Sequence, residues 1–275
     1  MLAGGGSASA SATPAPSPVR AGSYYLALGD SVAFGYREST NLPTPDYSKA
    51  NSFVGYPEDV GAALGLHVIN ASCPGETSSS FIATHVTSNG CENSPTGPVG
   101  YRTFYPLHVR YSGTQMSYAI HYLQTHPATH LVTLMIGAND AFLCEETTSD
   151  HCASELKATL RQITANVRTI LTNLRFQAGY HGQIVIVNYY SLDYASATDN
   201  ASSRALNSAM DLAGRFYHVT VADGYGAFER AAVQSGGDTC AAGLLTKLTT
   251  GGCGVHPSIA GQSLLALAVE RALTH

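Results

Sequence analysis

The chain has 275 residues, with 14 Lys and Arg against 19 Asp and Glu and a formal net charge of −5. This length suits one large α/β domain, and the scattered basic residues argue against an extended surface for nucleic acid. No apolar run reaches the ~18 residues of a membrane-spanning helix, so we expect no transmembrane segment.

The first 22 residues are rich in Gly, Ala, Ser and Pro, and they offer too little apolar surface to fold on their own. We interpret residues 1–22 as a flexible leader and residues 23–275 as a single domain. The leader has neither a charged start nor an apolar core, so it does not read as an intact signal peptide.

Apolar runs of strand character alternate with segments of helical periodicity along the rest of the chain. The predicted strands are residues 24–28, 67–71, 131–136, 183–190 and 218–222. The predicted helices are residues 53–64, 114–125, 154–176, 200–216 and 257–273. This alternation predicts an α/β fold, a three-layer α/β/α sandwich with a central five-stranded parallel sheet.

Three connecting segments stand out. Residues 36–52 are rich in Pro, Asn, Thr and Ser and predict a loop over one side of the carboxyl edge of the sheet. Residues 91–113 are too long for an ordinary connection, so they form either a substrate-binding loop or a surface flap over apolar core. Residues 144–152 predict an acidic loop closed by a disulfide.

The first strand ends in Gly29-Asp30-Ser31, which places Ser31 at the carboxyl edge of the sheet, where α/β proteins bind ligands. Alone, this tripeptide is as typical of a turn or a helix N-cap. Partners follow at two further strand ends, Gly75 and Asn139, and His256-Pro257 precedes the last predicted helix.

These four blocks resemble, in order and spacing, those of the SGNH (GDSL-type) hydrolase family, in particular its disulfide-containing extracellular esterases and lipases. The resemblance covers the chain from about Tyr24 onward and implies a flavodoxin-like sheet. It implies that Ser31 is the nucleophile and His256 the general base. It further implies an oxyanion hole formed by the backbone N–H groups of Ser31 and Gly75 and the side-chain amide of Asn139.

The chain departs from the family where the acid of the triad is usually found. The last block usually reads Asp-x-x-His-Pro, but here Cys253 lies three residues before His256. Our hypothesis is a Ser–His dyad in which the backbone carbonyl of Cys253 orients the imidazole. The alternative is a remote acid, Asp238 or Asp223, that folds back to His256.

Six cysteines allow fifteen pairings, and loop-closure entropy favours pairs that are close in the sequence. The favoured disulfides are Cys73–Cys91, Cys144–Cys152 and Cys240–Cys253. Such a framework indicates an oxidising compartment and a secreted, extracellular protein. The alternative is six buried, reduced thiols in a cytosolic enzyme.

The resemblance implies hydrolysis of a carboxylic ester through an acyl-serine. No metal-ligand spacing, phosphate loop or dinucleotide motif is evident, so we expect no cofactor and no metal. Short acyl esters, lipids or phospholipids and acetylated glycans all occur as substrates in the family; we favour a small, soluble ester and a monomeric enzyme. A binding module that has lost efficient catalysis remains the alternative, because the usual acid is missing.

Overall fold

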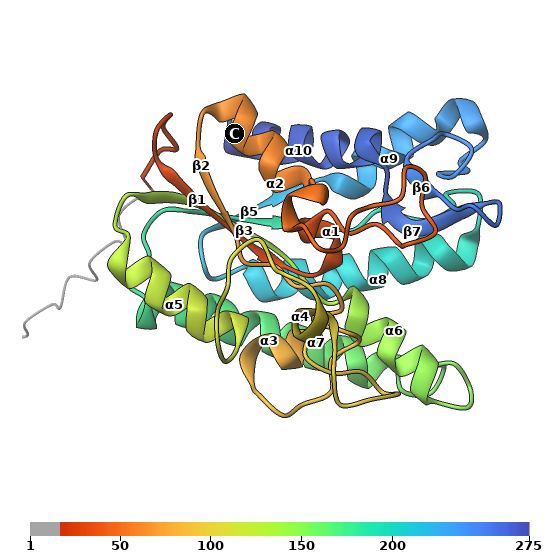
Figure 1. Ribbon diagram of the computed structural model, residues 1–275, viewed down its shortest axis with the longest axis horizontal. Coiled ribbons are helices and arrows are strands. Elements are labelled where there is room, and N and C mark those ends of the chain that lie inside the picture. Colours follow the sequence, from red (N-terminus) through yellow and green to blue (C-terminus); the bar gives the residue numbers. More distant parts are fainter. Residues whose placement is uncertain (1–16, 275) are drawn as a thin grey trace, which may run out of the picture.

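A parallel sheet forms the centre of the computed structural model, which describes residues 17–274 (Figure 1). Its strands are β1 (Tyr24–Gly29), β2 (His67–Asn70), β3 (Thr129–Met135), β4 (Gln183–Val187) and β5 (Val219–Ala222). They pair in the order β2-β1-β3-β4-β5, all parallel, which is the order of flavodoxin-like sheets. The predicted α/β fold with a five-stranded parallel sheet is confirmed.

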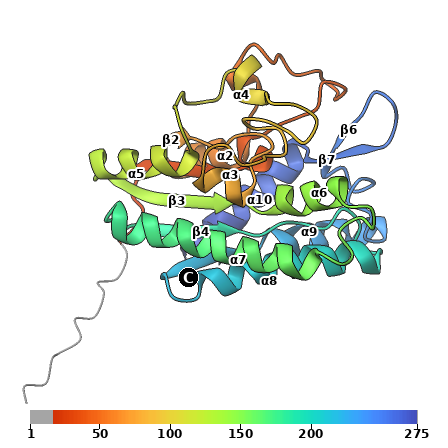
Figure 2. The same ribbon diagram turned by 90° about the horizontal axis from the view of Figure 1, so that it is seen from below.

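Helices cover both faces of this sheet (Figures 1 and 2). One face carries α2 (Tyr56–Leu64), α9 (Gly224–Ala232) and α10 (Ile259–Leu273). The other carries α3 (Ser78–Ile82), α5 (Gln115–Thr125), α6 (Ala138–Thr147), α7 (Leu156–Thr172) and α8 (Ala197–Gly214). The central strands are therefore buried on both sides, and Leu26, Leu28, Val132 and Leu134 have no exposed surface. Each such side chain contributes about 1.5–3 kcal/mol to stability.

Several predicted boundaries are wrong. The segment 144–152 is not wholly a loop, because α6 continues to Thr147. The helix expected over residues 154–176 is α-helical only from Leu156 to Thr172, and a π-helical turn follows over Asn173–Gln177. These errors are confined to element ends, where the apolar period gives the least information.

The sequence analysis missed the hairpin that carries His256. β6 (Leu245–Lys247) and β7 (Cys253–Pro257) form a two-stranded antiparallel sheet apart from the central one. His256 was expected at the N-terminus of the last helix, but it lies within β7, and Ser258 caps α10. These strands are too short and too polar to give a strand signal in the sequence.

A second apolar cluster lies beside the carboxyl edge of the sheet. Phe34, at the end of α1 (Ser31–Phe34), packs with Phe53 and with Tyr101 in α4 (Tyr101–Phe104). The segment 91–113 therefore packs directly onto the helix that begins with Ser31. Figure 2 shows α4 and the loops around it projecting from the sandwich.

All three favoured disulfides are present, and they use every cysteine: Cys73–Cys91, Cys144–Cys152 and Cys240–Cys253. Residues 1–16 of the expected leader lie outside the described residues. Its last residues contact the domain, since the N–H of Gly22 donates a 2.7 Å hydrogen bond to the carbonyl of Gly65.

Candidate active site

Ser31 is the first residue of α1, directly after β1. Asp30 caps this short helix by accepting a 3.0 Å hydrogen bond from the N–H of Val32. Gly29 makes the turn possible, because its φ is +142° and a Cβ there would lie 2.1 Å from the carbonyl oxygen of Met135. The end of β1 therefore lies against the backbone of β3 at Met135, and Ser31 follows it at the carboxyl edge of the sheet.

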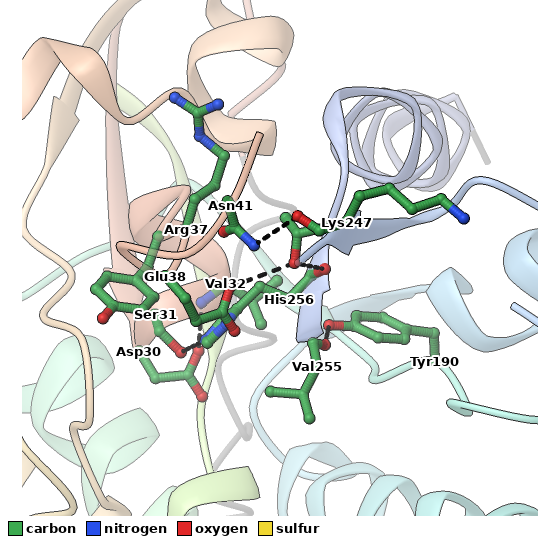
Figure 3. A network of polar contacts seen from close by, with 12 residues as sticks. Asp30, Ser31, Val32, Arg37, Glu38, Asn41, Tyr190, Lys247, Val255 and His256 are labelled. Carbon is green, nitrogen blue, oxygen red and sulfur yellow. Dashed lines mark hydrogen bonds and ion pairs between the residues drawn. The ribbon is translucent and has the colours of Figure 1, made fainter. Parts of the chain in front are cut away.

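His256 comes from the other end of the chain to meet Ser31 (Figure 3). Its Nε2 lies 2.9 Å from Ser31 Oγ. Two side chains hold the backbone around the imidazole: Thr246 Oγ1, from β6, donates to the His256 carbonyl over 3.2 Å, and the hydroxyl of Tyr190, which follows β4, donates to the Val255 carbonyl over 2.6 Å. The structure therefore brings together the two residues that the sequence analysis placed at opposite ends of the chain.

The other imidazole nitrogen faces an acid that the sequence analysis did not identify. Glu38 Oε1 lies 2.6 Å from His256 Nδ1, while Glu38 Oε2 lies 3.3 Å from Thr246 Oγ1 and is a second acceptor within reach of that hydroxyl's one proton. Partial burial acts against the charged carboxylate, but the hydrogen bond and positive charge that His256 can offer lower the pKa of Glu38. Only 26 % of the Glu38 side chain is exposed, so water screens the pair weakly.

This arrangement corrects the expectation for Cys253. Cys253 lies in β7 opposite Lys247, and the Nδ1 that its carbonyl was expected to meet is bound by Glu38 instead. The carboxylate at Nδ1 is also neither of the two remote acids that the sequence analysis considered. Asp223 caps α9 by accepting from the N–H of Gly226, and Asp238 accepts from the N–H of Ala241.

The segment that carries Glu38 is tied to the hairpin that carries His256. Asn41 Nδ2 and the N–H of Leu42 both donate to the carbonyl of Lys247, each over 3.2 Å, and the N–H of Thr249 donates to the carbonyl of Thr40 over 2.7 Å. Figure 3 shows Asn41 beside Lys247 above the imidazole. The acid and the histidine thus belong to one hydrogen-bonded unit.

Gly254 leaves the space that Glu38 occupies. A Cβ at this glycine would lie 2.7 Å from Glu38 Oε1 and 2.9 Å from Thr246 Oγ1. The only sequence signal for Glu38 was therefore indirect: an acid in the loop predicted to cover the active edge, and a glycine two residues before the histidine.

The two further candidates for an oxyanion hole follow the two strands that flank β1. Gly75 follows β2 and has a φ of +80°, and a Cβ there would lie 2.4 Å from the carbonyl oxygen of Asn89. Asn139 lies in the first turn of α6, after β3, and only 7 % of it is exposed. Since β2, β1 and β3 are neighbours, these residues and Ser31 share one edge of the sheet.

Two buried carboxylates brace these turns. Asp140 accepts hydrogen bonds from the N–H and hydroxyl of Ser78, and burial raises the pKa of its carboxyl to about 6. Asp30 accepts from the Tyr189 hydroxyl as well as from Val32, and burial raises its pKa to about 6 as well. Both act as acceptors for turn donors.

Glu76 lies next to Cys73 and Cys91 in a buried group of potential metal-ligand atoms. The two sulfurs are bonded to each other, so they are not thiolates that could bind a metal ion. This group is therefore better described as a disulfide packed against a buried carboxyl.

A serine, a histidine and an acid joined in series at the carboxyl edge of an α/β sheet form the arrangement of a serine hydrolase. The family model described as GDSL-like Lipase/Acylhydrolase family matches residues 27–264. The chain therefore belongs to this family and is a carboxylic ester hydrolase.

Solved structures with the same fold include two of one esterase, as wild type and as a mutant, and one of an α/β hydrolase. The acetylxylan esterase Axe2 from Geobacillus stearothermophilus is 16% identical with a TM-score of 0.57, covering 94% of this chain and 97% of that chain. A mutant of Axe2, described as an acetyl-xylooligosaccharide esterase, is 17% identical with the same TM-score and coverage. LAE5, an α/β hydrolase from the metagenome of Lake Arreo, Spain, is 16% identical with a TM-score of 0.51, covering 93% and 97%.

No curated protein matches the sequence. Among residues 17–274, no helix combines the length and apolar character needed to span a bilayer.

Proposed function

We propose that the chain hydrolyses carboxylic esters through an acyl-enzyme on Ser31, with His256 and Glu38 completing a catalytic triad. The observation that supports this most is the continuous series of contacts from Ser31 Oγ to His256 Nε2 and from His256 Nδ1 to Glu38, over 2.9 and 2.6 Å. A serine hydroxyl needs a base at this distance to become a nucleophile.

In the proposed reaction, Ser31 Oγ attacks the ester carbonyl while His256 takes its proton and then transfers it to the leaving alcohol. Water, activated by the same imidazole, then releases the acid. The N–H groups of Ser31 and Gly75 and the amide of Asn139 would hold the oxyanion of both tetrahedral intermediates. Loss of one such donor typically lowers turnover by ~10²–10³-fold.

Glu38 distinguishes this triad from the dyad expected from sequence. A backbone carbonyl can orient the imidazole but carries no net charge, whereas an ionised carboxylate also stabilises the imidazolium that forms during attack. The missing acid was the reason to consider a catalytically weakened binding module, and Glu38 at Nδ1 removes that reason.

We favour a small, soluble ester with a short acyl group over a phospholipid or another lipid. The ring of Tyr36 lies edge-on to His256 at 4.9 Å and stacks on Phe53, so a packed aromatic group stands beside the imidazole. Acetylated glycans also carry a short acyl group, and the acetyl esterase of the same fold makes them the first alternative. The three disulfides support a place in an oxidising, extracellular environment.

The test is a series of p-nitrophenyl esters from acetate to palmitate, with and without a serine-directed organophosphate. We expect the highest kcat/KM for acetate or butyrate, a single mass adduct on the wild type and no adduct on Ser31→Ala. Turnover that rises toward palmitate would overturn the substrate proposal, while absence of both adduct and turnover would favour the binding module.

A further inference from the structure

Asn89 contacts Gly75 and Asn139, the two candidates for the oxyanion hole other than Ser31. Its backbone N–H donates a 2.8 Å hydrogen bond to the carbonyl of Gly75, and its side-chain Nδ2 lies 3.4 Å from Asn139 Oδ1. We propose that Asn89 is a positioning residue that sets the direction of the Asn139 amide and the turn of Gly75. This inference rests on the oxyanion-hole role proposed above.

The chemistry of an amide makes the contact with Asn139 directional. An asparagine side chain has one acceptor end and one donor end, and rotation by 180° exchanges them. When Asn89 donates to Oδ1 of Asn139, the Nδ2 of Asn139 points the other way and stays available to an oxyanion. Because the Asn139 side chain is buried, water is a poor competitor for either end.

The turn of Gly75 is fixed from the same side. The N–H of Glu76 donates to the carbonyl of Cys73 over 3.1 Å, which closes the turn, and Asn89 binds the carbonyl of Gly75. The Asn89 carbonyl approaches Gly75 so closely that only a glycine fits. Asn89 thereby restrains the peptide units around the Gly75 N–H without touching the reacting atoms.

Asn89 can do this because its own segment is held rigidly. Ser88 Oγ donates to the carbonyl of Asn93 over 2.6 Å, the N–H of Gly90 donates to the same carbonyl over 2.9 Å, and Asn93 Nδ2 donates to the carbonyl of Val86 over 3.0 Å. The buried Cys73–Cys91 disulfide links the segment covalently to the Gly75 turn. Gly75 and Asn89 therefore lie inside one closed covalent loop.

Two single variants and their combinations with Asn139→Ala test the proposal. Asn89→Leu keeps the backbone contact and similar volume but loses the side-chain donor, and we expect kcat to fall about 10-fold with KM nearly unchanged. Asn89→Asp is isosteric but offers only acceptors, so the Asn139 amide should turn its Nδ2 toward residue 89. We expect its kcat to approach that of Asn139→Ala, about 10²-fold below wild type.

The double variants separate positioning from other effects. If Asn89 acts through Asn139, neither substitution lowers kcat further in the Asn139→Ala background. An equal loss in both backgrounds would overturn the proposal and indicate a direct charge or folding effect, as would wild-type kcat in Asn89→Leu. Glu92→Gln is the matched control in the same segment, and thermal melts verify that each variant folds.

The same set of variants tells this inference apart from the proposed function. A wild-type kcat for Asn139→Ala alone would remove Asn139 from the oxyanion hole and the inference with it. A large loss in Asn139→Ala combined with no loss in Asn89→Leu or Asn89→Asp would leave the oxyanion hole intact and overturn only the role of Asn89.

Discussion

The two halves of the proposed active site, the nucleophile half with Ser31 and the base half with His256, are built differently. Ser31, Gly75 and Asn139 follow three neighbouring strands of the central sheet, whose buried core fixes their backbones. His256 and Glu38 come from a two-stranded hairpin and an irregular loop held by hydrogen bonds and a disulfide. The geometry of the nucleophile half therefore depends on the stability of the whole fold. The geometry of the base half depends on a few local contacts. Substitutions in the base half should therefore change catalysis more than folding.

The largest effect should come from Glu38→Gln. The amide keeps the size of the side chain but removes the charge that stabilises the imidazolium, so we expect kcat to fall about 10³–10⁴-fold with little change in the melting temperature. Steady-state kinetics on p-nitrophenyl acetate measures this. Asp223→Asn and Asp238→Asn are the controls, and a comparable loss in either of them with an active Glu38→Gln would restore the remote-acid alternative.

The disulfides Cys240–Cys253 and Cys144–Cys152 allow a matched comparison of stability and activity, because only the first is close to His256 in the sequence. Removing Cys240–Cys253 or Cys144–Cys152 by paired substitution to Ala should each cost about 2.5–3 kcal/mol in the free energy of unfolding on the chain-entropy model. Only the loss of Cys240–Cys253 should also lower kcat at a temperature where both variants are folded, because Cys253 lies in the strand of His256. Equal kcat in the two variants would contradict a separate base half.

In the nucleophile half, pH should act on stability through Glu76. This carboxyl is fully buried, and burial raises its pKa to about 7 although Ser80 and Gln115 donate to it. Between the usual glutamate pKa and about 7, the folded state keeps a proton that the unfolded state has lost. Stability should therefore fall by up to about 1.4 kcal/mol per pH unit over this interval and level off above it. Urea unfolding at pH 5, 6, 7 and 8 should show this slope in the wild type. In Glu76→Gln the slope between pH 6 and 7 should be lost, while the part below about pH 6 that comes from Asp30 and Asp140 remains.

The smallest effect should come from Gly254→Ala. The added methyl group would meet Glu38 Oε1 at 2.7 Å, so the carboxylate has to move away from His256. We expect about a 10-fold loss of kcat and an almost unchanged melting temperature, since only the ends of the Glu38 and Thr246 side chains have to move. Gly97→Ala is the control, because its Cβ would meet no atom within 4 Å. A melting temperature that falls in proportion to activity would indicate general disruption instead.

The same division decides how much could be predicted from sequence. The strand ends at Ser31, Gly75 and Asn139 follow from apolar runs and from the geometry of a parallel sheet, so their convergence could be predicted. The place of Glu38 could not be predicted, because it lies in a loop without periodicity. That loop is held beside His256 by contacts with a hairpin that has no strand signal in the sequence. Cys253 was chosen because it lies near His256 in the sequence, but the extended β7 leaves His256 Nδ1 to a residue that is remote in the chain.

Glu38 follows Ser31 by only seven residues, so the proposed nucleophile and acid are encoded by one short stretch of the gene. A motif search that requires an acid three positions before the histidine would discard this chain as inactive. Searching apparently acid-less relatives for a carboxylate shortly after the serine, together with a glycine two positions before the histidine, would recover enzymes built in the same way.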